Sequence, residues 1–188
     1  MIKLKDVEMQ YNDNGQEILA LKLKELNIEN GKQVAFVGAS GSGKTTLFNL
    51  ISGMIVPTEG SVQVNDLEVT SLTESERDLF RANHIGYIFQ DFNLFNEFTV
   101  LQNVILPLSF SKVYSKKEMN EMALAVLKQV GIEDKINQKV KTLSGGEKQR
   151  VAIARSIINA PDIILADEPT GNLDYKNGTK IMEILTKI

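Results

Sequence analysis

The chain has 188 residues, which favours one domain with a sizeable core, and its balance of 43% apolar and 24% charged residues is typical of an α/β protein. The net charge of −3 gives no reason to expect nucleic acid or an anionic membrane surface as a partner. The absence of cysteine excludes disulfides and thiol chemistry, and no apolar run approaches the roughly 18 residues that span a bilayer. If the protein works at a membrane, another chain therefore crosses it.

The first third of the chain predicts mainly strands. Residues 2–11 alternate between apolar and polar side chains, with a slip near Asp6 where we expect a β-bulge. A turn at residues 12–15 leads to a second strand at residues 19–28. A later turn at residues 57–60 is followed by a short strand. These segments together predict a part of the chain built mainly of strands.

A glycine-rich loop interrupts these strands. Residues 34–37 are continuously apolar and predict a strand buried on both faces, and residues 47–51 predict a helix. The pattern G-x-x-x-x-G-K-[ST] runs between them from Gly38 to Thr45. In that context the loop is a phosphate cradle, because glycines let backbone N–H groups approach phosphate oxygens at the positive end of a helix.

The residue types in this loop match the needs of a nucleotide. Lys44 offers a point charge to the β- and γ-phosphates, and the Thr45 hydroxyl can ligate Mg²⁺. The alternative is a glycine-rich turn before an ordinary helix. The four fixed letters of the pattern arise by chance in roughly 1% of chains of this length, so we favour nucleotide binding.

Helix signals dominate the middle of the chain. Capping boxes begin three predicted helices. The box Thr73–Glu76 starts a helix that runs through Phe80, and Thr99–Gln102 starts one that ends at Pro107. The box Ser115–Glu118 starts a third helix, which Gly131 closes. Residues 85–89 predict another buried strand, which stops at Gln90. Residues from about 91 to 142 are therefore expected to form a mainly helical insertion.

Two carboxylates follow the next apolar segment. Residues 162–166 predict a buried strand that ends at Asp167 and Glu168. Downstream of a phosphate loop, the first acid can hold Mg²⁺ through water and the second can polarise the attacking water. Taken alone, the pair could equally be a solvated strand end.

A second glycine-rich helix start lies at residues 143–150, Leu-Ser-Gly-Gly-Glu-Lys-Gln-Arg. Two glycines in the first turn lower helix stability without an obvious gain, so the segment is either an unusual cap or a second anion site.

This segment resembles the signature motif of ATP-binding-cassette (ABC) ATPases. The other motifs occur in that family's order: Tyr11 at the adenine-stacking position, Gly38–Thr45 as Walker A, Gln90 as the Q-loop, Asp167–Glu168 as Walker B and Gly171–Asp174 as the D-loop. Residues 89–94 and 170–174 look most like the branch that serves lipoprotein release, macrolide export and bacteriocin export. The resemblance covers the whole chain.

The resemblance implies a P-loop NTPase (RecA-like) α/β core with an antiparallel β subdomain, residues 1–188 forming one nucleotide-binding domain. ATP would be contacted by Tyr11, Gly38, Ala39, Ser40, Gly41, Ser42, Gly43, Lys44, Thr45 and Thr46, and by Ser144, Gly145, Gly146 and Glu147. The catalytic residues would be Glu168, Lys44 and Gln90, and the Mg²⁺ ligands Thr45, Gln90 and Asp167.

The family also implies partners and a location. Two copies would pair head to tail, with each ATP between one Walker A and the other copy's signature motif. A separate membrane permease would dock near Gln90 and the helical insertion, which places the ATPase in the cytoplasm, peripheral on the inner face of the cell membrane. Two alternatives remain open: a soluble ABC ATPase acting on ribosomes or DNA, and a nucleotide-binding module with little turnover.

The alternatives for single residues are simpler. Tyr11 could merely pack at a strand end, and Gln90 could be a polar strand terminus. We expect His84 at the surface, and structural or interface contacts for Arg81 and Arg150.

One motif of the family is not seen in the sequence, namely a strand that ends in a histidine contacting the γ-phosphate. The helix expected from about Tyr175 is the last element, and His84 is the only histidine. We therefore expect a natural chain longer by roughly 20–40 residues, because the apolar strand at 162–166 needs a neighbour on each side.

Overall fold

The computed structural model describes every residue except 14, 111 and 112, so part of the predicted turn at 12–15 lies outside the described residues. The chain forms two compact units, residues 1–81 and residues 82–188.

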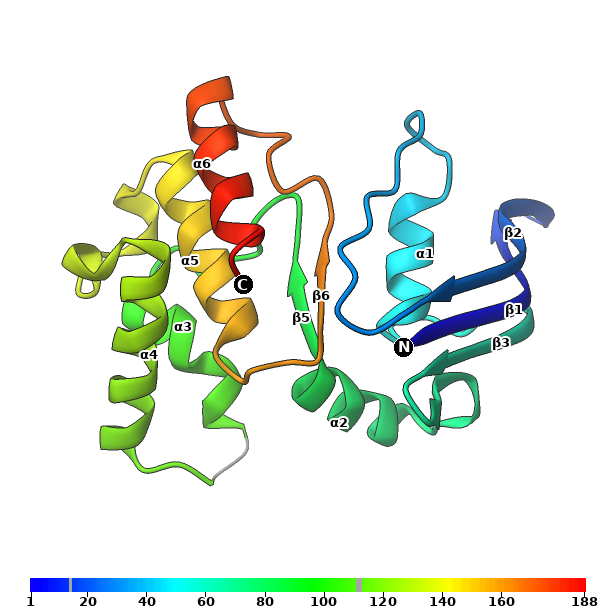
Figure 1. Cartoon of the computed structure of the whole chain (residues 1–188), viewed down its shortest axis with the longest axis horizontal. Helices are drawn as coiled ribbons and strands as arrows, with labels where there is room; N and C mark the ends of the chain where they lie inside the picture. The colour runs from blue at the N-terminus through cyan, green and yellow to red at the C-terminus, as the bar shows by residue number, and fades with distance from the viewer. Residues whose placement is uncertain (14, 111–112) are drawn as a thin grey trace. The chain divides into compact units, whose positions relative to one another are not determined.

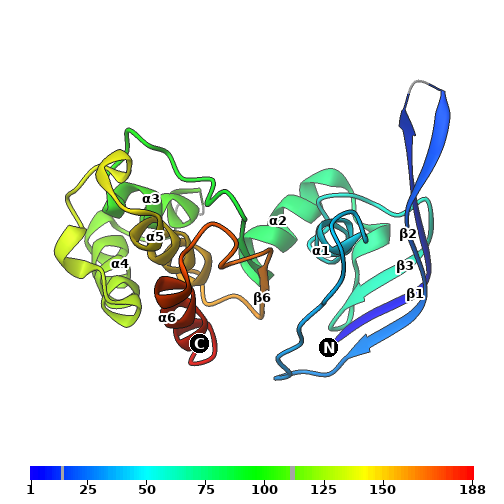
Figure 2. The ribbon, with the colours of Figure 1, turned by 90° about the horizontal axis from the view of Figure 1, so that it is seen from above.

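The first unit is built on a four-stranded antiparallel sheet with the order β2-β1-β3-β4. Its strands are β1 (Ile2–Asp13), β2 (Gln16–Ile28), β3 (Glu59–Val64) and β4 (Leu67–Glu68). The expected bulge is confirmed, because the register of β1 against β3 shifts between Lys5 and Glu8, and Asp6 has φ +48°. The first strand continues two residues beyond Tyr11, and the β1–β2 hairpin extends past the rest of its sheet (Figure 2).

Helix α1 (Lys44–Ile51) includes the predicted helical residues 47–51 and contacts strands β2 and β3 of this sheet. Its buried side chains, Leu47, Leu50 and Ile51, share the unit's core with Leu4 and Val7 of β1. The unit is completed by the 3₁₀ turn η1 (Val69–Ser71) and by α2 (Glu74–His84), which crosses into the second unit.

The predicted buried strand at residues 34–37 is wrong. The structure assigns no strand there, Val34 is 51% exposed and Val37 is 95% exposed. An apolar run becomes a buried strand only when neighbouring strands pair with it, and no described strand forms a ladder with these residues.

The second unit holds a two-stranded parallel sheet, β5 (Ile85–Ile88) and β6 (Ile163–Ala166), with Ile85 opposite Ile163. Its helices lie together on one side of this strand pair (Figure 1); they are α3 (Val100–Ser109), α4 (Lys116–Val130), α5 (Gly145–Ile157) and α6 (Tyr175–Leu185). The 3₁₀ turns η2 (Glu133–Lys135) and η3 (Val140–Thr142) complete the predicted helical insertion.

A single apolar core holds these elements together. It joins Ile88 of β5 to side chains of all four helices, including Val104, Leu127, Ile153 and Ile181. Helix α5 approaches β5 so closely that a Cβ on Gly86 would lie 2.4 Å from the carbonyl oxygen of Ser156. Glycine at position 86 thus sets the distance between α5 and the sheet.

The three predicted capping boxes are confirmed, and the proline signal is not. Thr99 and Ser115 begin α3 and α4 with capping boxes, and Gly131 closes α4 with φ +71°. At the start of α2 the Thr73 N–H donates to Glu76 Oε2 at 2.8 Å, and the Glu76 N–H donates to Thr73 Oγ1 at 3.4 Å. Pro107, however, lies inside α3, which continues to Ser109. A proline this near the C-terminal end removes one intrahelical hydrogen bond without stopping the last residues.

None of the described helices is both long and apolar enough to cross a membrane.

Candidate functional site

The phosphate loop is a tight turn that carries Lys44 back over its own backbone. Gly41 and Gly43 have φ +78° and +89°, in the left-handed region that favours glycine. The Lys44 Nζ donates to the carbonyl oxygens of Gly38 and Ala39, both at 2.9 Å. The loop thus holds the Lys44 ammonium group against the backbone that leads from Gly38 to the start of α1.

The start of α1 differs from the starts of the capped helices. Its N-cap residue is Gly43, which has no side chain to bond the first N–H groups, whereas α3, α4 and α5 each begin with a capping box. The first-turn N–H groups of a helix have no intrahelical acceptors. Together with Lys44, they are expected to form an electropositive surface that suits a phosphate group.

Replacement of Gly43 by alanine is expected to weaken ATP binding by more than tenfold. Its Cβ would lie 2.8 Å from the carbonyl oxygen of Ala20 and 3.2 Å from Leu21 Cδ1, and the residue must also hold φ +89°. The loop has to shift, which moves the N–H donors of α1 away from the phosphate position.

The matched control is Gly31→Ala. Gly31 also has a positive φ of +72°, but a Cβ there meets nothing within 4 Å. It should cost about 1–2 kcal/mol of stability and leave affinity unchanged. Nucleotide titration and urea unfolding of both variants measure the two effects, and equal affinities would show that the loop tolerates the side chain.

In the second unit, Gln90 and the two carboxylates meet where β5 and β6 end. The Asp167 N–H donates to the carbonyl oxygen of Ile88 at 2.9 Å, which continues the strand pairing by one residue. The Gln90 Nε2 donates to Glu168 Oε2 at 3.0 Å, although the two residues are 78 positions apart. Glu168 and Gln90 are solvent-exposed, and Asp167 is 8% exposed.

The two carboxylates have different surroundings. Burial raises the pKa of Tyr87 to about 12, with the charge of Asp167 as the second cause. Asp167 is buried, and its charge acts on the Tyr87 hydroxyl. Glu168 instead faces solvent and has φ +46°, which is unusual for a residue with a side chain.

The helix after the Ser-Gly-Gly segment starts with a reciprocal cap. The Ser144 N–H donates to Glu147 Oε2 at 2.8 Å, and the Glu147 N–H donates to Ser144 Oγ at 3.4 Å. The backbone and hydroxyl hydrogen bonds from Ser144, with a smaller effect of Lys135, hold the pKa of Glu147 below its usual value. A pocket of about 360 Å³ lies beside this helix start, and Lys135, Arg150 and Lys180 line it with Glu147.

The two glycines of this segment also have a packing role. A Cβ on Gly146 would lie 3.3 Å from Asn177 of α6, and one on Gly145 would lie 3.4 Å from Leu173. Close packing against Asn177 therefore accounts for glycine at position 146 in part, whereas the contact at position 145 is an ordinary one. The second anion site stays a prediction.

Arg155 was missed by the sequence reasoning. From α5 it donates to the carbonyl oxygens of Phe92 and Asn93 at 2.8 and 2.5 Å, and both acceptor residues have positive φ. A guanidinium thus fixes the strained turn that follows Gln90. No local signal marks this role, because the partners lie more than sixty positions away.

The remaining predicted residues occupy simpler positions. Tyr11 is 42% exposed and pairs with Ile18 across the hairpin, so adenine stacking stays a prediction. His84 is partly exposed, and its Nδ1 lies 2.7 Å from Asp162 Oδ2. Arg81 and Arg150 donate to backbone carbonyls, of Gly53 and Val130 respectively, which are structural contacts.

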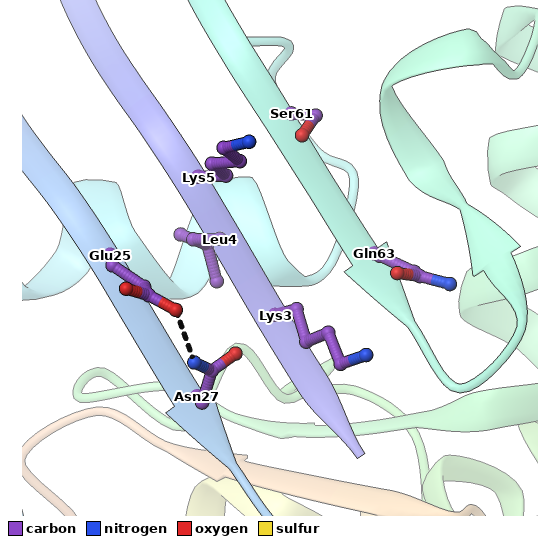
Figure 3. A pocket seen from close by; sticks show the side chains of 7 residues that line it. All are labelled: Lys3, Leu4, Lys5, Glu25, Asn27, Ser61 and Gln63. Carbon is purple, nitrogen blue, oxygen red and sulfur yellow. Dashed lines mark hydrogen bonds between the residues drawn. The ribbon is translucent and has the colours of Figure 1, made fainter.

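A second hollow, of about 170 Å³, lies on the polar face of the antiparallel sheet. Figure 3 shows Lys3, Lys5, Glu25, Asn27, Ser61 and Gln63 around it, with Asn27 donating to Glu25 at 2.7 Å. It contains none of the predicted site residues.

The proposed Mg²⁺ ligands come from both units. Thr45 belongs to the first unit, and Gln90 and Asp167 belong to the second. Among the described residues no three His, Cys, Asp or Glu side chains form a cation cage. Hydroxyl, amide and carboxylate oxygens are the donor types that Mg²⁺ accepts when phosphates and water complete its shell.

These features define a class of protein. A phosphate loop opening an uncapped helix, an acid pair at the end of a parallel strand and a Ser-Gly-Gly helix start together describe an ATP-binding cassette.

Comparison with known proteins identifies the family. The family described as ABC transporter matches residues 21–171, and this chain belongs to it. It is 46% identical over 191 residues to the uncharacterized ABC transporter ATP-binding protein MJ0796 of Methanocaldococcus jannaschii, covering all of this chain and 81% of the relative. It is 38% identical to the lipoprotein-releasing system ATP-binding protein LolD of Psychrobacter arcticus, covering 100% and 83% of the two chains. It is 45% identical to the macrolide export ATP-binding/permease protein MacB of Bdellovibrio bacteriovorus, of which it covers 28%.

Solved structures agree with this assignment. A dimeric structure of a post-hydrolysis state of the ATP-binding cassette MJ0796, bound to ADP and Pi, matches with a TM-score of 0.92 and 45% identity, covering all of this chain and 82% of that one. The dimeric structure of MJ0796, described as a bacterial ABC transporter cassette, also gives 0.92. The predicted P-loop fold class is confirmed, and the chain is an ABC ATPase.

Proposed function

We propose that this chain binds ATP with Mg²⁺, hydrolyses it between two head-to-tail copies and so drives a separate membrane permease for export or extraction. The hydrogen bond between Gln90 and Glu168, 3.0 Å long, carries the proposal. It links the residue that would sense the γ-phosphate to the residue that would polarise water.

Each residue has a defined role. Lys44 and the N–H groups at the start of α1 hold the β- and γ-phosphates, while Glu168 accepts a proton from the attacking water. Thr45, Gln90 and Asp167 would hold Mg²⁺, which neutralises charge on the phosphate oxygens when bound. Ser144 to Glu147 would face the ATP of the partner copy.

The names of the relatives support the two proposed partners, a second copy of the ATPase and a membrane permease. The LolD and MacB relatives are described as parts of lipoprotein-releasing and macrolide-export systems, and the MJ0796 cassette is described as dimeric. By analogy, we propose that the permease docks near Gln90 and the helical insertion, so that the ATPase is held at the cytoplasmic face of the membrane. Co-purification with an integral membrane protein tests this part.

Dimerisation supplies the sharpest test. A Glu168→Gln chain should sediment as a dimer with ATP and as a monomer without it, because hydrolysis no longer reopens the pair. A Glu168→Gln chain that also carries Ser144→Arg should stay monomeric with ATP, because the arginine side chain would fill the space of the phosphates of the partner copy's ATP.

Ser115→Arg is the matched control, because Ser115 is also the N-cap of a capping-box helix. It should lose a similar cap energy, about 1 kcal/mol, yet still dimerise with ATP. Dimerisation by the Ser144→Arg variant would contradict the head-to-tail arrangement.

A further inference from the structure

We propose that Asn172 is a positioning residue that holds Gln90 against Glu168. The inference rests on the proposed function of Glu168 as the base for ATP hydrolysis. It concerns a contact between the segments that follow the two parallel strands.

Asn172 joins the two segments directly. Its Nδ2 donates to the carbonyl oxygen of Gln90 at 3.0 Å and lies 3.4 Å from Asp91 Oδ1. Gln90 and Asn172 are 82 positions apart, so only the tertiary structure brings them together. We call this contact the Asn172 bridge.

The bridge closes a ring around the catalytic carboxylate. The Gln90 side chain donates to Glu168 Oε2, the Gly171 N–H donates to the carbonyl oxygen of Glu168 at 2.9 Å, and Asn172 returns to Gln90. A Cβ on Gly171 would lie 3.3 Å from Glu168 Oε2, so the backbone of residue 171 borders the carboxylate. The carboxylate thus lies between the Gln90 amide and the backbone beside Asn172.

This ring of hydrogen bonds matters because the side chains that form it are exposed and are not fixed by packing. Glu168, Gln90 and Asn172 are exposed, and Glu168 has a φ of +46°. An exposed side chain on a strained backbone samples several rotamers unless hydrogen bonds select one. By holding the Gln90 backbone, Asn172 fixes the position from which the Gln90 side-chain amide reaches Glu168.

The test uses the full chain and separates turnover from binding. Asn172→Ala should lower kcat about 3- to 10-fold, the loss expected for one neutral hydrogen bond, with KM and nucleotide affinity unchanged within twofold. Asn172→Asp keeps the shape but cannot donate, and it should lose at least as much.

Asn159→Ala is the matched control. Asn159 Nδ2 also donates to a backbone carbonyl at 3.0 Å, that of Ala82, and Asn159 has no part in the proposed catalytic machinery. Its kcat should stay within twofold of the parent, although urea unfolding should register a similar loss of stability.

A double variant tests the route of action. Gln90→Ala keeps the carbonyl that Asn172 bonds but removes the amide that orients Glu168, so adding Asn172→Ala should cause no further loss of kcat. An equal loss in both backgrounds, or an unchanged kcat for the single variant, would overturn the inference. If Glu168→Gln abolishes turnover while Asn172→Ala does not alter it, only this inference fails. Retained turnover in Glu168→Gln removes the proposed function and the inference together.

Discussion

Lys44→Ala should weaken ATP binding by about 100-fold or more. In the structure the Lys44 ammonium lies over the loop, 2.9 Å from two carbonyl oxygens, where it can exchange these acceptors for phosphate oxygens. A hydrogen bond to a charged group contributes about 1.5–3 kcal/mol, and Lys44 would bond to both the β- and the γ-phosphate. Fluorescent nucleotide titration at fixed Mg²⁺ measures the change.

Lys32→Ala is the appropriate control for charge alone. Lys32 belongs to the same unit, its side chain is 63% exposed, and it forms a long ion pair with Glu29 at 3.9 Å. It should bind ATP as the parent does, because an exposed ion pair contributes little. An affinity for ATP that is the same in the two variants would disprove the assignment of the phosphate loop.

Glu168→Gln should retain ATP binding within a fewfold and lower phosphate release by at least about 100-fold. A positioned general base contributes about 10²–10⁴ in rate, and the amide keeps the shape while losing proton affinity. The glutamine oxygen can still accept the hydrogen bond from Gln90, so the local geometry is preserved. Steady-state phosphate release and nucleotide titration give the two quantities.

Glu183→Gln in α6 controls for the loss of one negative charge, since Glu183 is an exposed residue away from the strand ends. Its turnover should equal that of the parent. Were the Glu168→Gln variant to turn over within twofold of the parent, another residue would have to be the base.

Local chemistry made much of the fold predictable. The capping boxes at Thr73, Thr99 and Ser115 and the glycine cap at Gly131 lie where the sequence placed them. These signals are reliable because each donor and its acceptor lie within four residues, so no distant partner is needed. The phosphate loop is predictable for the same reason, since the loop and the helix that follows it are one continuous segment.

Which segments are buried was less predictable from the sequence. The apolar run at residues 34–37 has the composition of a buried strand, yet Val37 is 95% exposed. Composition reports what a segment can bury, whereas pairing with neighbouring strands decides whether it does. Pro107 failed as a stop signal because the contacts of α3 with the core, through Val104 and Leu108, outweigh one missing hydrogen bond.

By itself the sequence determined the list of candidate groups: Lys44 in its loop, the acid pair after a strand and the Ser-Gly-Gly helix start. Only the tertiary structure decided which groups touch, placing Gln90 on Glu168, Asn172 on the Gln90 backbone and Arg155 on the turn after it. The reason is the parallel pairing of β5 with β6. Two strands far apart in sequence end at the same edge, so side chains separated by some eighty positions become neighbours.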